Sequence, residues 1–195
     1  MWTISNTALW AGAIGSWLFI VVFLVDGLTR PGYRPVRQPV SALALGSRGW
    51  LQTTNFVVCG LLITVGAFAL GNVLLTIAVA VFGLVLVASG VFPMDPMRGY
   101  PPGTPEGTPE GLSLTHKLHD WAGAAVFSAL PVASLIAVFV LPNWQWYSGL
   151  TCAAATTGFL AFGQAWENDT PYTGLLQRAT IIIGWSWLGF LFATT

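Results

Sequence analysis

The fold is decided by residues 49–94, which read GWLQTTNFVVCGLLITVGAFALGNVLLTIAVAVFGLVLVASGVFPM and contain no Asp, Glu, Lys or Arg. A helix that crosses a bilayer needs about 20 apolar residues, so this stretch is too long for one crossing and fits two. Gly71-Asn72 lies at its centre, and a Gly-Asn pair ends helices and forms tight turns. The stretch therefore predicts a helical hairpin that spans a membrane.

Three other stretches lack charged residues: 1–25, 121–166 and 179–195. Residues 121–166 repeat the pattern, with Pro142-Asn143 as the central break, and the two terminal stretches each fit one crossing. The sequence thus predicts one all-α domain over residues 1–195, an integral membrane bundle of six transmembrane helices. These are expected at about 8–26, 52–70, 73–92, 119–141, 145–164 and 178–194.

The composition agrees with a membrane environment. Only 7% of the 195 residues are charged and 55% are hydrophobic, whereas soluble domains have about 25% charged residues. Mean hydropathy is +0.72, and 13% of the residues are aromatic. These values exclude a soluble enzyme and a disordered chain, and a net charge of zero argues against nucleic acid as a partner. Cys59 and Cys152 lie in apolar runs, which excludes a disulfide scaffold.

All charged residues fall in three windows, 26–48, 95–120 and 167–178. The six-helix path places these windows on the same side of the membrane, and the opposite side carries only the termini and two tight turns. Positively charged loops favour the cytoplasm. We therefore expect a multi-pass protein of the cell membrane whose charged face is cytoplasmic and whose termini are outside.

The first window begins at Asp26, directly after an apolar run. A carboxylate there is costly unless it is paired or faces a polar cavity, so Asp26 is a candidate general acid. Three prolines prevent a continuous helix in the long segment that follows, and we expect this segment to fold back as a lid. Ser41 is expected to cap a short helical segment over residues 42–45.

The second window places Asp95 between two prolines at a helix end, and Thr115 is the expected N-cap of the next helix. His116, His119 and Asp120 follow at helical spacings that put them on one face. Three interpretations stay open: an acid–base or substrate-anchoring group, a metal site, and polar residues that hydrogen-bond the loops. In the third window, Arg178 is expected to pair with Glu167 or Asp26.

Several motifs resemble the bacterial and archaeal membrane family called domain of unknown function 998. They are Pro-Val-Ser41-Ala-Leu-Ala, Gly46-x-x-Gly-Trp50-x-Gln-x-x-Asn-Phe56, Phe92-Pro-Met-Asp95-Pro and Gly174-Leu-x-Gln-Arg178. The resemblance implies a six-helix fold over nearly the whole chain. The family supplies no settled activity and no catalytic residues.

The candidate site residues form two groups. The candidate catalytic residues are Asp26, His116, His119, Asp120 and Glu167. The candidate substrate-binding or structural residues are Arg30, Arg37, Ser41, Trp50, Gln52, Asn55, Asp95, Gln177 and Arg178. Neither a metal nor a cofactor is expected.

Ionisable and aromatic residues near one membrane face suit an enzyme that acts on a lipid or isoprenoid by acid–base chemistry, such as isomerisation or cyclisation. The alternative is a non-catalytic lipid-binding protein or an accessory subunit of a membrane complex. A transporter is disfavoured, because transport usually places ionisable groups at the bilayer midplane. The expected partners are membrane lipids and a lipophilic small molecule, and a homo-oligomer stays open.

Overall fold

The computed structural model describes residues 4–195, and its architecture is all-α. The six long helices are α1 (Ile4–Thr29), α2 (Gly49–Ala67), α3 (Val73–Val91), α4 (Leu114–Val140), α5 (Gln145–Glu167) and α6 (Thr173–Thr194). Short 3-10 helices lie at Val40–Ala44 and Pro142–Trp144. The predicted six-helix bundle is therefore confirmed.

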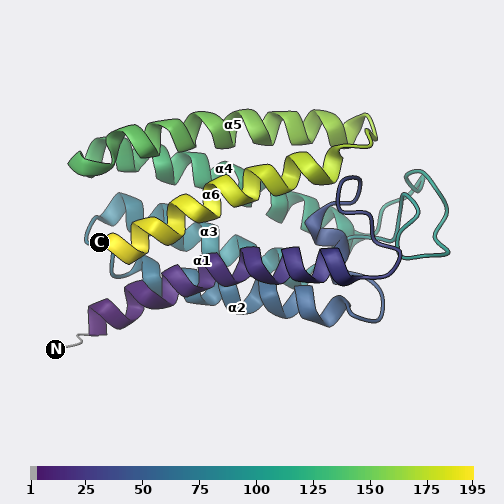
Figure 1. The fold of residues 1–195 in the computed structure, drawn as a ribbon, viewed down its shortest axis with the longest axis horizontal. Coiled ribbons are helices and arrows are strands. Elements are labelled where there is room, and N and C mark those ends of the chain that lie inside the picture. Colours follow the sequence, from purple (N-terminus) through teal and green to yellow (C-terminus); the bar gives the residue numbers. More distant parts are fainter. Residues whose placement is uncertain (1–3) are drawn as a thin grey trace.

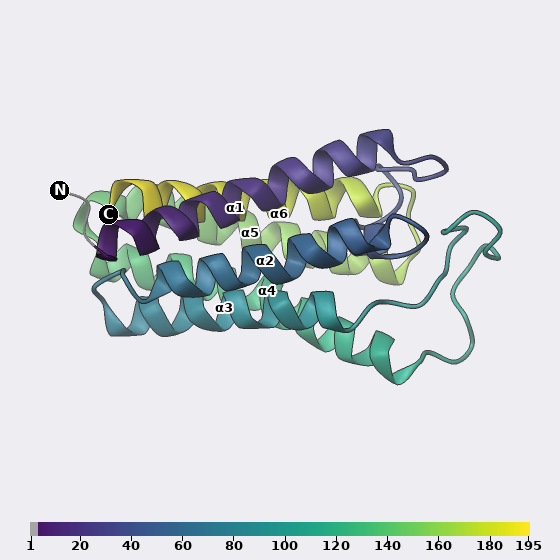
Figure 2. The ribbon, with the colours of Figure 1, turned by 90° about the horizontal axis from the view of Figure 1, so that it is seen from below.

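The helices form a closed ring in which each one packs against the next in sequence and α6 packs against α1. Figures 1 and 2 show the helices running back and forth along the long axis, with the start of α1 and the end of α6 at one end. The long connections 30–48 and 92–113 lie together at the opposite end (Figure 1). The charged windows therefore share one face, as the sequence predicts.

Within the described residues, α1, α2, α3, α4 and α6 are each long and apolar enough to cross a membrane. The fifth helix, α5, has 23 residues and packs against both α4 and α6, but it is more polar than these five helices and is not among them. The chain is thus a multi-pass membrane protein.

Large rings fill the centre of the bundle. Trp185 of α6 contacts Phe19 of α1 and Phe82 of α3, with ring centroids 5.2 and 4.7 Å apart. Elsewhere the backbones approach closely: a Cβ on Gly66 would lie 2.7 Å from Gly12 Cα. Glycine allows this close packing of α1 and α2, a common device in membrane helices.

The segment 30–48 folds back onto the start of α6. The Gly174 and Leu175 amides donate to carbonyls of residues 37 and 36 at 3.1 and 2.9 Å, which satisfies two orphan donors of that helix. This explains why α6 begins at Thr173 rather than at the predicted 178.

Two predicted caps are wrong. The 3-10 helix Val40–Ala44 follows Pro39 and has no side-chain cap, and Ser41 Oγ instead donates to the Met94 sulfur at 3.5 Å. Ser113, not Thr115, caps α4: its hydroxyl accepts the His116 amide at 3.1 Å. The helix consequently begins at Leu114 rather than at the predicted 119.

Candidate functional site

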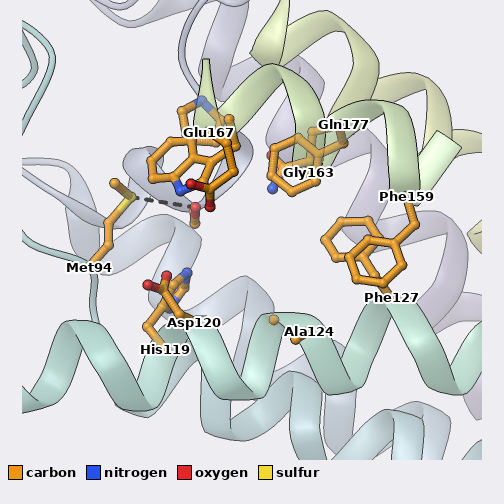
Figure 3. Close-up of a pocket in the computed structure, with 14 residues that line it drawn as sticks. Met94, His119, Asp120, Ala124, Phe127, Phe159, Gly163, Glu167 and Gln177 are labelled. Carbon is orange, nitrogen blue, oxygen red and sulfur yellow. Dashed lines mark hydrogen bonds between the residues drawn. The ribbon is translucent and has the colours of Figure 1, made fainter. Parts of the chain in front are cut away.

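A pocket of about 260 Å³ lies between α4 and α5 at the charged end of the bundle. Figure 3 shows His119 and Asp120 on α4 across the pocket from Glu167 and Gln177. Phe127 and Phe159 stack at the end away from the charged loops, with centroids 5.5 Å apart. The full lining is Pro39, Ser41, Met94, His119, Asp120, Gly123, Ala124, Phe127, Phe159, Phe162, Gly163, Trp166, Glu167 and Gln177.

Small residues on the two facing helices create this space. A Cβ built on Gly123 or on Gly163 would meet no atom within 4 Å. Asp120, Ala124 and Glu167 are exposed where the pocket opens between the helices. The pocket can therefore admit a molecule from the side of the bundle, with an aromatic end and a polar end.

A second cavity of about 40 Å³ adjoins the first toward the bundle centre. Ser41, His119, Gly123, Phe127 and Gln177 line both cavities. Aromatic and aliphatic side chains make up most of the inner wall; among them are Phe19, Phe56, Leu86, Ile181 and Trp185.

His119 presents a free acceptor atom at the junction of the two cavities. The side chain is 8% exposed, and its Nδ1 lies 2.8 Å from the Phe92 carbonyl oxygen and 3.0 Å from that of Ser89. A carbonyl oxygen can only accept, so in the neutral ring Nδ1 carries the proton and Nε2 keeps its lone pair. Of the two histidines, only His119 lines the pocket.

The other histidine, His116, does not line the pocket but contacts Asp120, which lies at its polar end. His116 Nδ1 accepts the Asp95 amide at 2.8 Å, so its proton is on Nε2, 3.3 Å from Asp120 Oδ2. The Asp95 carboxylate in turn accepts from the hydroxyl and amide of Ser113 at 2.6 and 2.8 Å. Hydrogen bonds from Ser113 are the main cause that lowers the pKa of Asp95. These contacts fix the start of α4 and orient Asp120.

Gln177 connects the pocket to the folded-back segment. Its Oε1 accepts the Val40 amide at 2.6 Å, so the amide NH2 is the group left for another partner. This hydrogen bond also holds Pro39 and Ser41 against the pocket, both of which line it.

Asp26 lies apart from the pocket. Its side chain is fully buried and pairs with Arg30, four residues along the chain, while its Oδ1 lies 2.7 Å from Arg48. Arg30 also donates to the carbonyls of Leu45 and Arg48 at 2.9 and 2.8 Å. The cost of burying this carboxylate is thus offset by two guanidinium groups, and Asp26 takes no place in the candidate site.

The predicted ion pair of Arg178 is wrong. Arg178 Nη1 donates to the carbonyls of Pro35, Gln38 and Gly174 at 2.5 to 3.0 Å, and Nη2 donates to the Tyr33 hydroxyl. Backbone dipoles replace the expected carboxylate, because the segment 30–48 turns its carbonyls toward the start of α6. Burial, against the opposing influence of Arg178, raises the pKa of Tyr33 to about 12.

The remaining predicted residues are not brought to the pocket. Arg37 lies 3.4 Å from both Glu106 and Asp169, and Trp50 is 67% exposed. Asn55 donates to the Phe19 carbonyl at 3.2 Å and to Gln52 at 3.3 Å, which links α2 to α1. Within the described residues, no three His, Cys, Asp or Glu side chains are placed to share a metal ion.

Sequence reasoning missed the wall that α5 supplies. Phe159, Phe162, Gly163 and Trp166 all line the pocket, and their spacing of three, four and seven residues puts them on one helical face. That periodicity is readable from the sequence, although any packed helix can show it. The facing residues Gly123 and Ala124 carry no such signal.

The comparison with known protein families agrees with the motifs described above. No curated protein and no solved structure matches the chain. The family model described as "protein of unknown function (DUF998)" matches residues 13–194. The chain therefore belongs to the DUF998 family of proteins of unknown function.

Proposed function

We propose that this protein is an enzyme that binds a lipophilic molecule between α4 and α5 and transfers a proton on it, with His119 as the base. One observation carries the proposal: Nδ1 of His119 is held by two carbonyls, which leaves the Nε2 lone pair on the wall of a cavity. A histidine oriented through its other nitrogen is the usual arrangement of a general base.

The shape of the pocket supports a lipophilic substrate. Its aromatic end, formed by Phe127, Phe159 and Phe162, suits an isoprenoid or acyl chain, and ring faces also stabilise positive charge that develops on a hydrocarbon. The polar end lies near the membrane face, where a lipid carries its polar group. A substrate can thus enter from the bilayer with its tail directed toward Phe127.

The chemistry is a proton shift. His119 Nε2 takes a proton from one carbon of the substrate, the imidazolium exchanges that proton with water, and the ring then delivers a proton to another carbon, so that a double bond moves and the product is an isomer. Because one proton leaves the substrate and one proton returns to it, the step balances without an oxidant or a second substrate. Cyclisation is the related alternative at the same site; it would begin from the imidazolium form of His119, whose Nε2–H donates the initiating proton.

A second candidate is lipid binding without chemistry, alone or as a subunit of a membrane complex. The pairing of Asp26 with Arg30 and Arg48 favours this second candidate, because Asp26, the general acid predicted from the sequence, is then not available in the pocket. The pocket is the same in both proposals, and only proton transfer separates them.

The proposed orientation places the charged face in the cytoplasm and both termini outside the cell membrane. The seven Lys and Arg residues all lie in segments at that face or at the adjacent helix ends, which agrees with the positive-inside rule. The substrate's polar group would then lie in the cytoplasmic leaflet.

Deuterium incorporation tests the enzyme proposal. The purified protein is incubated in D2O with a membrane-lipid extract from its source organism, and the lipids are analysed by mass spectrometry. We expect one lipid to gain carbon-bound deuterium with the wild type and none to do so with His119→Gln. If lipid binds to both proteins but gains no deuterium, catalysis is refuted and the second candidate, lipid binding without chemistry, stands.

The pocket itself is tested with Gly163→Leu, which fills the space beside α5 without meeting a protein atom at Cβ. Leucine favours the helix over glycine by up to about 1 kcal/mol, so loss of binding would not reflect unfolding. Gly149→Leu is the matched control on the same helix: its Cβ would lie in ordinary contact, 3.8 Å from Val138, and Gly149 does not line the pocket.

A further inference from the structure

We propose that the molecule bound between α4 and α5 carries a neutral hydroxyl as its polar group, and is a long-chain or isoprenoid alcohol. This inference rests on the proposed function, because it names the class of substrate for the same pocket. It follows from the hydrogen-bond donors and acceptors that stay unpaired at the polar end of the pocket, and from the charges of the residues that line it.

The two groups at the junction of the cavities are complementary to a hydroxyl. His119 Nε2 offers a lone pair, because Nδ1 faces the carbonyls of Ser89 and Phe92. Gln177 offers N–H donors, because its Oε1 is occupied by the Val40 amide at 2.6 Å. Both side chains line both cavities. A hydroxyl can accept from the glutamine and donate to the histidine in the resting complex, and it keeps the Gln177 hydrogen bond when its O–H turns away so that Nε2 can take the carbon proton.

The charges of the pocket disfavour an anionic group. Among the described residues that line it are the carboxylates of Asp120 and Glu167, and none of these lining residues is a Lys or Arg. The nearby arginines have other contacts: Arg30 pairs with Asp26, Arg178 binds backbone carbonyls, and Arg98 lies over the Trp166 ring and 3.5 Å from Asp169. A phosphate or a carboxylate would therefore meet negative charge, with no cation among the lining residues to bind it.

An ammonium group fits less well than a hydroxyl. It has three donors and no acceptor, so it would leave the Gln177 N–H groups without a partner inside a largely buried site. A site rejects a close analogue of its ligand when that analogue leaves a buried polar group of the site without a hydrogen-bond partner. Asp120 is already engaged by His116 at 3.3 Å, which leaves Glu167 as the other carboxylate that lines the pocket.

The experiment uses four probes that share one chain and differ in the polar group: geraniol, geranic acid, geranyl phosphate and geranylamine. The full-length protein, labelled with 15N at tryptophan, is placed in lipid nanodiscs and titrated with each probe. The indole N–H signal of Trp166, which lines the pocket, reports occupancy and is assigned with Trp166→Phe. Gly163→Leu in the same nanodiscs measures shifts that come only from partition into the lipid.

We expect geraniol to shift the Trp166 signal in the wild type but not in Gly163→Leu, and to bind at least about tenfold more tightly than the other three probes. If the acid, the phosphate or the amine binds most tightly and Gly163→Leu abolishes that binding, the hydroxyl inference is wrong and the pocket stands. If every probe gives the same shift in both proteins, the lipophilic pocket itself is refuted.

Gln177→Glu tests the donor directly. Glutamate keeps an oxygen that can accept the Val40 amide but replaces the N–H donors with a second acceptor. We expect geraniol to bind about tenfold more weakly and geranylamine more tightly in this variant. Unchanged geraniol binding with an intact Trp166 signal would overturn the role of Gln177 in recognising a hydroxyl.

Discussion

Replacing Asp26 with asparagine should destabilise the protein more than any other single carboxylate-to-amide change at the charged face. The Asp26 side chain is fully buried, and that of Arg30 is 4% exposed. Asp26→Asn keeps the shape but removes the charge, so the Arg30 guanidinium stays buried without a counter-ion. Removing one partner of a buried pair costs about 3–5 kcal/mol.

The structure favours the lower end of that range. Arg30 keeps its hydrogen bonds to the carbonyls of Leu45 and Arg48, and the asparagine oxygen can still accept one. Arg48 contributes less, since its side chain is 41% exposed and the solvent screens its charge. We therefore expect Asp26→Asn to lower the free energy of unfolding by about 3 kcal/mol.

The assay is reversible unfolding by SDS in mixed micelles at neutral pH. Asp169→Asn is the matched control: Asp169 lies 3.4 Å from Arg37 and 3.5 Å from Arg98, with its side chain 37% exposed. It should cost less than about 1 kcal/mol. A double-mutant cycle should also give Asp26 a larger coupling energy to Arg30 than to Arg48. If Asp26→Asn costs no more than Asp169→Asn, the buried ion pair does not support the fold as argued.

Three further predictions concern the loops. Gly174→Ala would press a Cβ against the Gln38 and Pro35 carbonyl oxygens, so limited proteolysis should cut the segment 30–48 faster than in the wild type. Asp95→Asn should lower the free energy of unfolding by about 1 kcal/mol at neutral pH. Because the pKa of Asp95 is lowered in the folded protein, its contribution to the free energy of unfolding is present at pH values above the ordinary carboxylate pKa and is lost as the pH falls through the lowered pKa. Amide hydrogen exchange at the start of α4 should become faster over the same pH interval. Tyr33, whose pKa is about 12, should stay un-ionised at pH 11 in an ultraviolet titration, and Tyr33→Phe should leave that titration unchanged below pH 11.

The positions of the charges predicted the topology because a charge inside the bilayer costs several kcal/mol. That penalty acts on each residue separately, so it can be read from the chain without knowing any contact. The uncharged runs and the breaks at Gly71 and Pro142 accordingly located all six helices. The predicted starts of α4 and α6 were wrong because Ser113 and the segment 30–48 set them.

The partners of the charges were not predictable in the same way. The spacing of Asp26 and Arg30 is the helical i, i+4 pattern, but Arg48 reaches Asp26 only because the chain folds back. Arg178 binds carbonyls 140 and 143 residues away, which no local pattern contains. The pocket likewise depends on the separation of two helices, and only His119, Asp120, Glu167, Ser41 and Gln177 of the predicted site residues line it.

Mass spectrometry of the lipids that stay bound through purification tests the central claim most directly. The wild type, Gly163→Leu and Gly149→Leu are purified in a detergent that strips surface lipid, and each is extracted. We predict one lipophilic molecule in stoichiometric amount with the wild type and with Gly149→Leu, and its loss from Gly163→Leu. The same lipid complement in all three proteins would contradict the assignment of the space between α4 and α5 as a binding site.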